Sequence, residues 1–478
     1  MTSLMRLPLF QSNPVAALYE RRRRSQTAAI VLALLLATLP ASAQLNDGKP
    51  DPEFAVPEAL DLPYSLGFAL DNNFAIRQAR ERIRQQEGVV IEVGATRIPT
   101  IAGTAQYSRN DKALAGASFG GVDRNWNLSI RATQVLYAGG GVIAGVKNAE
   151  FAREAALLAM QAVVNDALLD VRTRFYTVLV NREKIKVQEQ NVGLLQRQLQ
   201  DVKNRYEAGT VSNFEVLRAE VALGNARTPL ITARNDHRLA IEELRRALGF
   251  VTTEPDVTKT PEFLGTLEFT PVSFELRSAL ATAREQRPDL QRLRKLETAA
   301  EEGVKARRAG YLPQLSAFGS YDFRKDPRSN GLSDTLHGWT AGVQSQWNIF
   351  DGRATAGRVA QARSLLEQAK LTVAEARLNV DVEVRRAIST FQQATELAEA
   401  SKKVVEQAEE ALRLANARFG AGTATQLDVL TSQVDLTTTR LNQLQAYYSY
   451  NVAVANVRRA MGLADELKPT GELPWPRP

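Results

Sequence analysis

Few residues in this chain have the types and spacing that chemistry requires. The sequence contains no cysteine and only two histidines, His237 and His337, which lie far apart and lack metal-ligand spacing or a nearby nucleophile pair. The absence of cysteine also excludes disulfides, thiolate metal sites and an acylated N-terminal cysteine. We therefore expect no enzymatic activity, no catalytic residues, no bound metal and no cofactor.

A glycine-rich stretch at residues 139–145, GGGVIAG, is a second candidate for chemistry because it joins an expected strand to an expected helix. It lacks the Gly-Lys-Ser/Thr of a phosphate-binding loop, and Ala144 stands where a dinucleotide-binding fingerprint needs its third glycine. We interpret the stretch as the bend between the strand and the helix.

Two turns in the sequence carry a repeated set of polar residues. Residues 205–217, RYEAGTVSNFEVL, and residues 418–430, RFGAGTATQLDVL, share an arginine, Ala-Gly-Thr, an acid and Val-Leu at matching offsets. Gly209 and Gly422 stand where a helix end needs a positive φ, and the arginine in each last turn favours the helix dipole. The repetition predicts that the chain is built from two copies of one unit.

The pattern of a capping box follows each turn. Ser212 stands three residues before Glu215, and Thr425 stands three residues before Asp428. In such a box the hydroxyl accepts a hydrogen bond from the third helical N–H, while the acid reaches back to the capping residue. We expect a capped helical reversal at both turns.

Long helices flank both turns. Residues 358–419 contain neither glycine nor proline, and small or apolar residues recur there in steps of three and four, which predicts a coiled-coil seam. In each half, two shorter helices could stack end to end beside one long helix. Pro229 should kink or break the first return helix. The expected helices span residues 65–97, 140–207, 212–248, 273–310, 353–419 and the stretch after the second turn.

Four stretches have the pattern of strands: residues 101–107, 126–135, 315–323 and 339–349. Residues 101–107 are short and mixed, whereas apolar and polar residues alternate in residues 126–135 and 339–349, so that these two strands each have one apolar face. A soluble antiparallel sheet would alternate in the same way, but these strand pairs are isolated between long helices, and a bare hairpin is only marginally stable in water. Four strands cannot close a barrel in lipid, so two copies would supply 8 strands and three copies 12.

The N-terminal segment has the pattern of a secretory signal. Four arginines at residues 21–24 precede an apolar run at residues 28–39 and a small-residue cleavage site at residues 41–43. The alternative is a transmembrane anchor, but the apolar run is too short to span a bilayer as a helix. Part of the net charge of +7 lies in this segment, so the rest of the chain is only weakly basic. The charge therefore gives no reason to expect binding of nucleic acid.

These features together predict five segments. Residues 1–43 form a signal peptide, and residues 44–250 form a first repeat of helix, strand pair, long helix, turn and return helix. Residues 251–272 form a connector in an equatorial belt around the middle of the helices. Residues 273–462 form the second repeat, and residues 463–478 form a C-terminal tail.

The order of these elements, repeated twice, resembles the TolC family of outer-membrane efflux proteins over essentially the whole mature chain. The resemblance implies a mixed fold in which a long α-helical coiled-coil barrel continues a transmembrane β-barrel of four strands per chain, 12 in a homotrimer. It also implies a location in the cell outer membrane, contact with its lipid, and a long periplasmic extension. The protein would be a passive exit duct for efflux or type I secretion.

The resemblance further implies partners and the residues that meet them. The partners are a periplasmic adaptor and an inner-membrane pump or ABC transporter, and the two turns are the tips that the adaptor grips. Asp428 and Glu215 match acids of the periplasmic aperture, whereas Thr431, Phe419 and Ala424 depart from the family's second ring acid, latch tyrosine and latch arginine. The alternative is an adaptor-like coiled-coil protein of the periplasm. The expected adaptor contacts are Arg205, Tyr206, Gly209, Thr210, Val211, Arg418, Phe419, Gly422 and Thr423.

Overall fold

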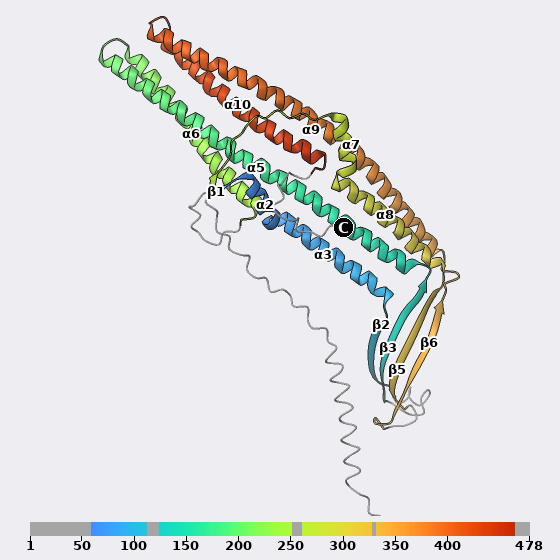
Figure 1. Cartoon of the computed structure of the whole chain (residues 1–478). Helices are drawn as coiled ribbons and strands as arrows, with labels where there is room; N and C mark the ends of the chain where they lie inside the picture. The colour runs from blue at the N-terminus through green and yellow to red at the C-terminus, as the bar shows by residue number, and fades with distance from the viewer. Residues whose placement is uncertain (1–58, 112–123, 251–260, 327–330, 464–478) are drawn as a thin grey trace, which may run out of the picture. The chain divides into compact units, whose positions relative to one another are not determined.

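The computed structural model describes residues 59–111, 124–250, 261–326 and 331–463 of the chain. The expected signal peptide, the first part of the connector and nearly all of the expected tail lie outside these residues. Helices dominate the described part, and a four-stranded sheet continues from their ends (Figure 1). No helix among the described residues is both long enough and apolar enough to cross a membrane.

Two helices of 67 residues form the spine of the fold, α5 (Gly141–Glu207) and α9 (Ala354–Gly420). Each turns back at a glycine into a return helix, α6 (Asn213–Leu248) after α5 and α10 (Gln426–Ala460) after α9. Helix α5 packs against α6 and α10, and α10 packs against α9. The observed bounds confirm the long helices and the turns to within a few residues.

The two shorter helices are broken, contrary to the prediction of single helices at residues 65–97 and 273–310. The first is divided into α2 (Leu62–Asn72) and α3 (Phe74–Gly94) because the Asn73 side chain caps α3, accepting from the N–H of Ala75 at 2.9 Å. The second is divided into α7 (Leu276–Gln286) and α8 (Pro288–Arg308), because Pro288 has no N–H to donate and opens a new helix.

Pro229 was expected to kink or break the first return helix, and the break is wrong, since α6 runs through this residue. Pro229 lies on the exposed side of the helix, so its ring faces solvent. The buried Ala226 and Leu230 on the other side belong to a cluster with α5. Packing on both sides of the missing hydrogen bond therefore keeps the helix in one piece.

The sheet is antiparallel with the strand order β2 (Thr100–Arg109), β3 (Arg124–Ala138), β5 (Gln314–Lys325) and β6 (Thr335–Gln346). The two hairpins join through β3 and β5, where Ala132 faces Gly319 and the register shifts between Val135 and Tyr137. The last strand ends at Gln346 rather than at residue 349 as expected. The central parts of the other three strands agree with the prediction.

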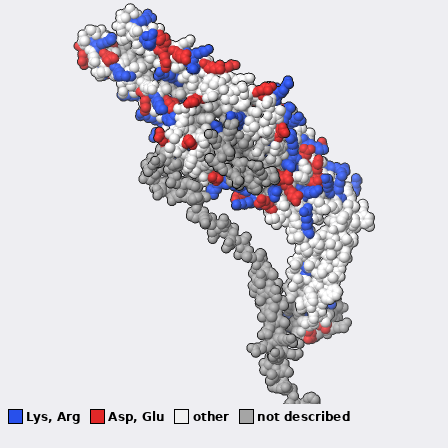
Figure 2. All heavy atoms as spheres, in the orientation of Figure 1, with Lys and Arg blue, Asp and Glu red and all other residues white. Residues whose placement is uncertain are grey.

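The two faces of this sheet differ in polarity. Residues opposite one another in an antiparallel pair share a face. One face therefore carries Trp126, Ile130, Tyr321, Trp339 and Val343, and the other carries serine, threonine and asparagine side chains. Trp339 keeps 77% and Val343 63% of its surface exposed, and the sheet has few charged atoms compared with the helices (Figure 2). The apolar face is thus uncovered in the single chain.

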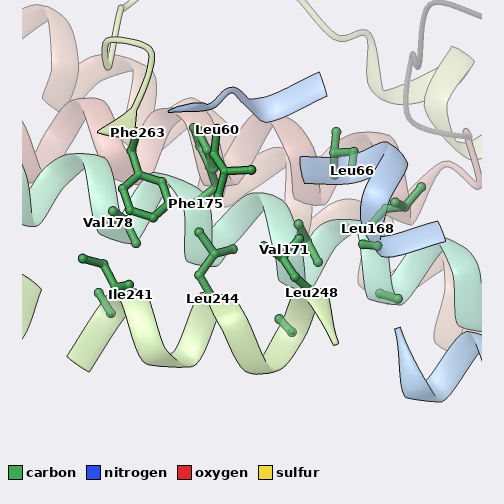
Figure 3. Close-up of a cluster of buried hydrophobic side chains, with 14 of the residues drawn as sticks. Leu60, Leu66, Leu168, Val171, Phe175, Val178, Ile241, Leu244, Leu248 and Phe263 are labelled. Carbon is green, nitrogen blue, oxygen red and sulfur yellow. The ribbon is translucent and has the colours of Figure 1, made fainter. Parts of the chain in front are cut away.

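Two clusters of buried side chains hold the middle of the helices together. In the first, Phe175 of α5 lies against Phe263 and Leu60, while Ile241 and Leu244 of α6 pack alongside (Figure 3). Leu60 and Phe263 belong to two short strands, β1 (Ala59–Leu60) and β4 (Glu262–Phe263), which pair in parallel. The second cluster joins α7, α9 and α10, with Val384, Phe391 and Tyr450 at its centre.

Candidate functional site

Each long helix ends at its tip in the same backbone motif. At the first tip Gly209 has φ 73°, its N–H donates to the Tyr206 carbonyl at 2.9 Å, and the Thr210 N–H donates to the Arg205 carbonyl at 2.9 Å. At the second tip Gly422 has φ 72°. The same two hydrogen bonds form there: the Gly422 N–H donates to the Phe419 carbonyl at 3.1 Å, and the Thr423 N–H donates to the Arg418 carbonyl at 2.9 Å. Both tips are Schellman motifs, as the glycines predicted.

The threonine after each glycine has a role that the sequence analysis missed. The hydroxyl of Thr210 donates to the Arg205 carbonyl at 2.9 Å, and that of Thr423 donates to the Arg418 carbonyl at 3.1 Å. Each carbonyl thus receives two bonds from one threonine. The repeated Gly-Thr pair in the sequence was the signal that could have indicated this.

The second tip contains the predicted capping box. The Thr425 hydroxyl accepts from the Asp428 N–H at 3.3 Å, and Asp428 Oδ2 accepts from the Thr425 N–H at 2.7 Å. The backbone hydrogen bond from Thr425, its hydroxyl bond to the same oxygen and the nearby charge of Arg418 lower the pKa of Asp428 below its ordinary value. Asp428 is exposed, so the second tip presents an ionised carboxylate to solvent.

The predicted capping box at the first tip does not form. The Ser212 side chain makes no capping hydrogen bond, and only its backbone carbonyl accepts from the Glu215 N–H, at 3.1 Å. Glu215 is half-buried, and its Oε2 atom is shielded from solvent without a hydrogen-bond partner in the structure. Neither of the two reciprocal hydrogen bonds of a capping box is therefore present at the first tip.

The two tips meet through a contact between distant parts of the sequence. The guanidinium carbon of Arg205 lies 5.0 Å from the centre of the Phe419 ring, within the range of a cation–π interaction. Both residues were expected at the tips, but nothing in their local sequence indicated that they touch. The remaining residues expected at the tips are exposed or half-buried, and a Cβ atom added at Gly209 or Gly422 would meet no atom within 4 Å. The tips thus present open surface.

The opposite ends of the return helices are tightly packed. Gly249 ends α6 with φ 79°, and a Cβ atom there would collide with the carbonyl of Asn72 at the break between α2 and α3. Gly462 follows α10 with φ 76°, and a Cβ atom there would lie 2.9 Å from Cα of Arg287 at the break between α7 and α8. We call these two places the junctions, defined by Gly249 with Asn73 and by Gly462 with Arg287.

Each junction is tied by a side chain from the break. Asn73 Nδ2 donates to the Ala247 carbonyl at 2.7 Å. Arg287, whose side chain is 6% exposed, forms ion pairs with Asp289 at 2.7 Å and with Glu383 at 2.5 Å. Burial by itself would lower the pKa of Arg287, but hydrogen bonds to Asp289 and Glu383 outweigh burial and raise it. The second junction therefore holds a charged group where the first holds an amide.

Neither histidine lies in a site suited to chemistry. Burial and the charge of Arg182 lower the pKa of His237, whose Nε2 atom has no hydrogen-bond partner in the structure. His337 lies on the sheet, its ring centre 6.0 Å from that of Phe323. In the described part of the chain, no group of three or more acidic or histidine side chains could hold a metal ion.

Comparison with known proteins identifies the family to which this fold belongs. The model of the outer membrane efflux protein family matches residues 66–250 and residues 279–463. CyaE of Bordetella pertussis is 25% identical over 386 residues, which cover 80% of this chain and 78% of that protein. The outer membrane protein TolC of Vibrio cholerae is 24% identical over 302 residues, 63% of this chain and 68% of that protein.

Solved structures show the same fold. The CmeC outer membrane channel of Campylobacter jejuni has a TM-score of 0.73 at 16% identity, covering 84% of this chain and 85% of that chain. The family and the solved neighbours are channels and not enzymes. Because the family model matches most of the sequence, this chain belongs to the outer membrane efflux protein family and resides in the outer membrane.

Proposed function

We propose that three copies of this chain form a passive exit duct through the outer membrane for an efflux or secretion system. The observation that carries the proposal is the sheet of β2, β3, β5 and β6, in which β2 and β6 pair on one side only among the described strands. Open strand edges are unstable in lipid because their backbone groups lack hydrogen-bond partners, and an uncovered apolar face is prone to aggregation in water. Pairing β2 of one copy with β6 of the next removes both edges.

Three copies would close a barrel of 12 strands with its apolar face toward lipid and its polar face toward a lumen. The helices would then continue the barrel into the periplasm. In the described chain α6 packs mainly against α5, and α9 packs against α10, α8 and α7, so that the remaining surfaces of α6 and α9 would meet neighbouring copies. The family model supports the repeat, since it matches residues 66–250 and again residues 279–463.

We place the belt at the connector, residues 251–272, of which the structure describes residues 261–272. Phe263 packs against Phe175 at a ring distance of 6.1 Å, and the guanidinium of Arg182 donates to the Gly265 carbonyl at 2.7 Å. The Tyr450 hydroxyl donates to the Thr270 carbonyl at 2.6 Å. These contacts tie the connector to the middle of both repeats, which supports its role in a belt.

The tips would dock a periplasmic adaptor, which links the duct to an inner-membrane pump or ABC transporter. Their exposure, the open space at both glycines and the contact between Arg205 and Phe419 support this role, because an adaptor needs a solvent-accessible surface with a fixed shape. Asp428 would line the periplasmic aperture as an ionised carboxylate, with Glu215 beside the first tip.

The assembly can be tested with cysteine cross-linking, because the chain has no cysteine of its own. Single cysteines along β2, from Thr104 to Tyr107, combined with single cysteines along β6, from Gly338 to Ala341, should join chains into covalent trimers in outer-membrane vesicles. Cysteines on β3 and β5 provide the control, because both strands are already paired. A monomeric product in the soluble fraction would refute the proposed duct.

Docking needs a separate test. Photoreactive groups at Thr210 and Thr423 should cross-link a periplasmic protein in cells, whereas the same group at the exposed Thr232 on α6 should not. Equal labelling at all three sites, or none at the tips, would contradict adaptor docking there while leaving the duct in place.

A further inference from the structure

The polar face of the sheet holds a small cluster of charges. Ser320 faces Arg131, Asp322 faces Ser129, and Arg324 faces Asn127 across the pair of β3 and β5. Arg131, Asp322 and Arg324 therefore share one face. No other residue of this face in the described strands is charged. Each chain thus contributes two positive charges and one negative charge, a net charge of +1 on this face.

Neighbouring side chains hold Arg131 in place. Its guanidinium carbon lies 4.3 Å from the centre of the Phe318 ring on the same face. The Phe318 ring in turn lies over Gly342, where an added Cβ atom would come within 3.1 Å of the ring. The glycine thus leaves room for the ring, and the ring supports the arginine. Arg131 is exposed despite this contact, so its charge remains accessible to solutes.

Asp322 and Arg324 lie farther from the helices than Arg131. The Ser320 hydroxyl donates to Asp322 Oδ2 at 2.9 Å, which orients the carboxylate. Arg324 is four residues beyond Ser320, the partner of Arg131, and so lies about 13 Å farther along the strand at ~3.3 Å per residue. The two arginines therefore mark two levels of the sheet, and the one carboxylate lies between them.

We propose that Arg131 and Arg324 make the membrane-spanning part of the duct selective for anionic solutes. The inference rests on the proposed duct, in which the polar face lines the lumen. Three copies would place rings of positive charge at two levels and one ring of carboxylates between them, with a net charge of +3. Rings of charged side chains select the ion of opposite sign in a pore. Asp322 reduces this preference without cancelling it.

Ion selectivity of the purified protein in planar bilayers tests the proposal. In a potassium chloride gradient, Arg131→Gln and Arg324→Gln should each lower the ratio of chloride to potassium permeability roughly twofold, because each removes one ring of three charges whose effect on a passing ion is screened by water and salt. Asp322→Asn should raise the ratio. Arg131→Lys keeps the charge and should preserve the ratio, and Gln344→Ala, an uncharged neighbour on the same face, should leave it unchanged.

The outcomes separate the two proposals. Channels with normal conductance whose permeability ratio does not change in Arg131→Gln and Arg324→Gln would overturn the selectivity and leave the duct standing. A wild-type protein that gives no conductance would overturn the duct and the selectivity together. A ratio that falls equally in Gln344→Ala would also overturn the role of charge.

A second measurement works without electrical recording. Because the chain lacks cysteine, a single Thr133→Cys two residues from Arg131 on the same face reports the local charge. The rate with a thiol reagent carrying a sulfonate, divided by the rate with one carrying a quaternary ammonium, should be higher than the same ratio for a free thiol in solution. Adding Arg131→Gln should lower that rate ratio roughly twofold. A rate ratio that Arg131→Gln leaves unchanged would also overturn the proposal.

Discussion

The tips and the junctions of this protein use the same helix ending for different purposes. Gly209 and Gly422 at the tips and Gly249 and Gly462 at the junctions all have a positive φ at the end of a helix. At the tips the space around the glycine is open, whereas at the junctions the backbone of another segment lies against it. The local sequence therefore specifies where a helix stops, but only the packing shows whether the end is a free surface or a fixed joint.

The two junctions also differ from each other, and the difference should be large enough to measure. Arg287→Ala removes a buried cation and leaves Asp289 without its bidentate partner, so we expect a loss of about 3 to 5 kcal/mol. Asn73→Ala removes one hydrogen bond and one cap and should cost about 1 kcal/mol. Thermal unfolding followed by helical circular dichroism would compare the two variants. Equal losses would show that the charged junction is no stronger than the amide one.

Replacing one glycine of each type by alanine would compare the stability that close packing contributes at a junction and at a tip. Gly249→Ala combines an unfavourable φ with a collision against Asn72, so we expect a loss of about 2 to 4 kcal/mol. Gly209→Ala meets open space and should cost about 1 kcal/mol. The same unfolding measurement applies. If both variants lost the same stability, the close packing at the junction would contribute nothing.

The sequence predicted the long elements well because their signals are long and periodic. Helix α9 begins and ends within one residue of its expected bounds, since residues 358–419 contain nothing that interrupts a helix. The strands were found from the alternation of apolar and polar residues, but their ends were less well predicted. For β6 the apolar Trp347 and Ile349 extended the pattern past the last ladder pair at Gln346.

Short interruptions and contacts between distant residues could not be predicted in this way. Asn73 interrupts an otherwise helical pattern, and this break becomes clear only where the end of a return helix packs against it. Pro288 was a local signal for the second break, and the prediction overlooked it. Pro229 was given too much weight because the sequence does not show which side of a helix is packed. Two similar patterns gave one capping box at Thr425 and none at Ser212, where the Glu215 Oε2 atom is shielded from solvent, and the local sequence does not show this burial.

The capping residues offer a comparison between the two tips themselves. Thr425→Ala should destabilise the start of α10 by about 1 kcal/mol because it removes the acceptor for the Asp428 N–H. Ser212→Ala should have almost no effect, because the Ser212 hydroxyl caps nothing. Amide hydrogen exchange measured on peptides covering residues 213–218 and 426–431 would detect each change locally. Faster exchange after Ser212→Ala would mean that the first tip forms its box in solution.

The smallest expected effect concerns the contact that joins the tips. Arg205 stacks on Phe419, whereas the corresponding pair at matching offsets, Arg418 and Tyr206, makes no such contact in the described tips. A double-mutant cycle of Arg205→Gln and Phe419→Leu should show a coupling of about 0.5 kcal/mol, the value for an exposed cation–π pair.

The control double-mutant cycle, with Arg418→Gln and Tyr206→Leu, should show no coupling energy. Hydrogen exchange at the amides of Thr210 and Thr423 is a suitable readout, since both amides close the Schellman motifs next to these side chains. The coupling in the first cycle corresponds to roughly a twofold change in exchange rate. Similar coupling in both cycles would mean that the tips interact symmetrically and that Arg205 has no special role in holding them together.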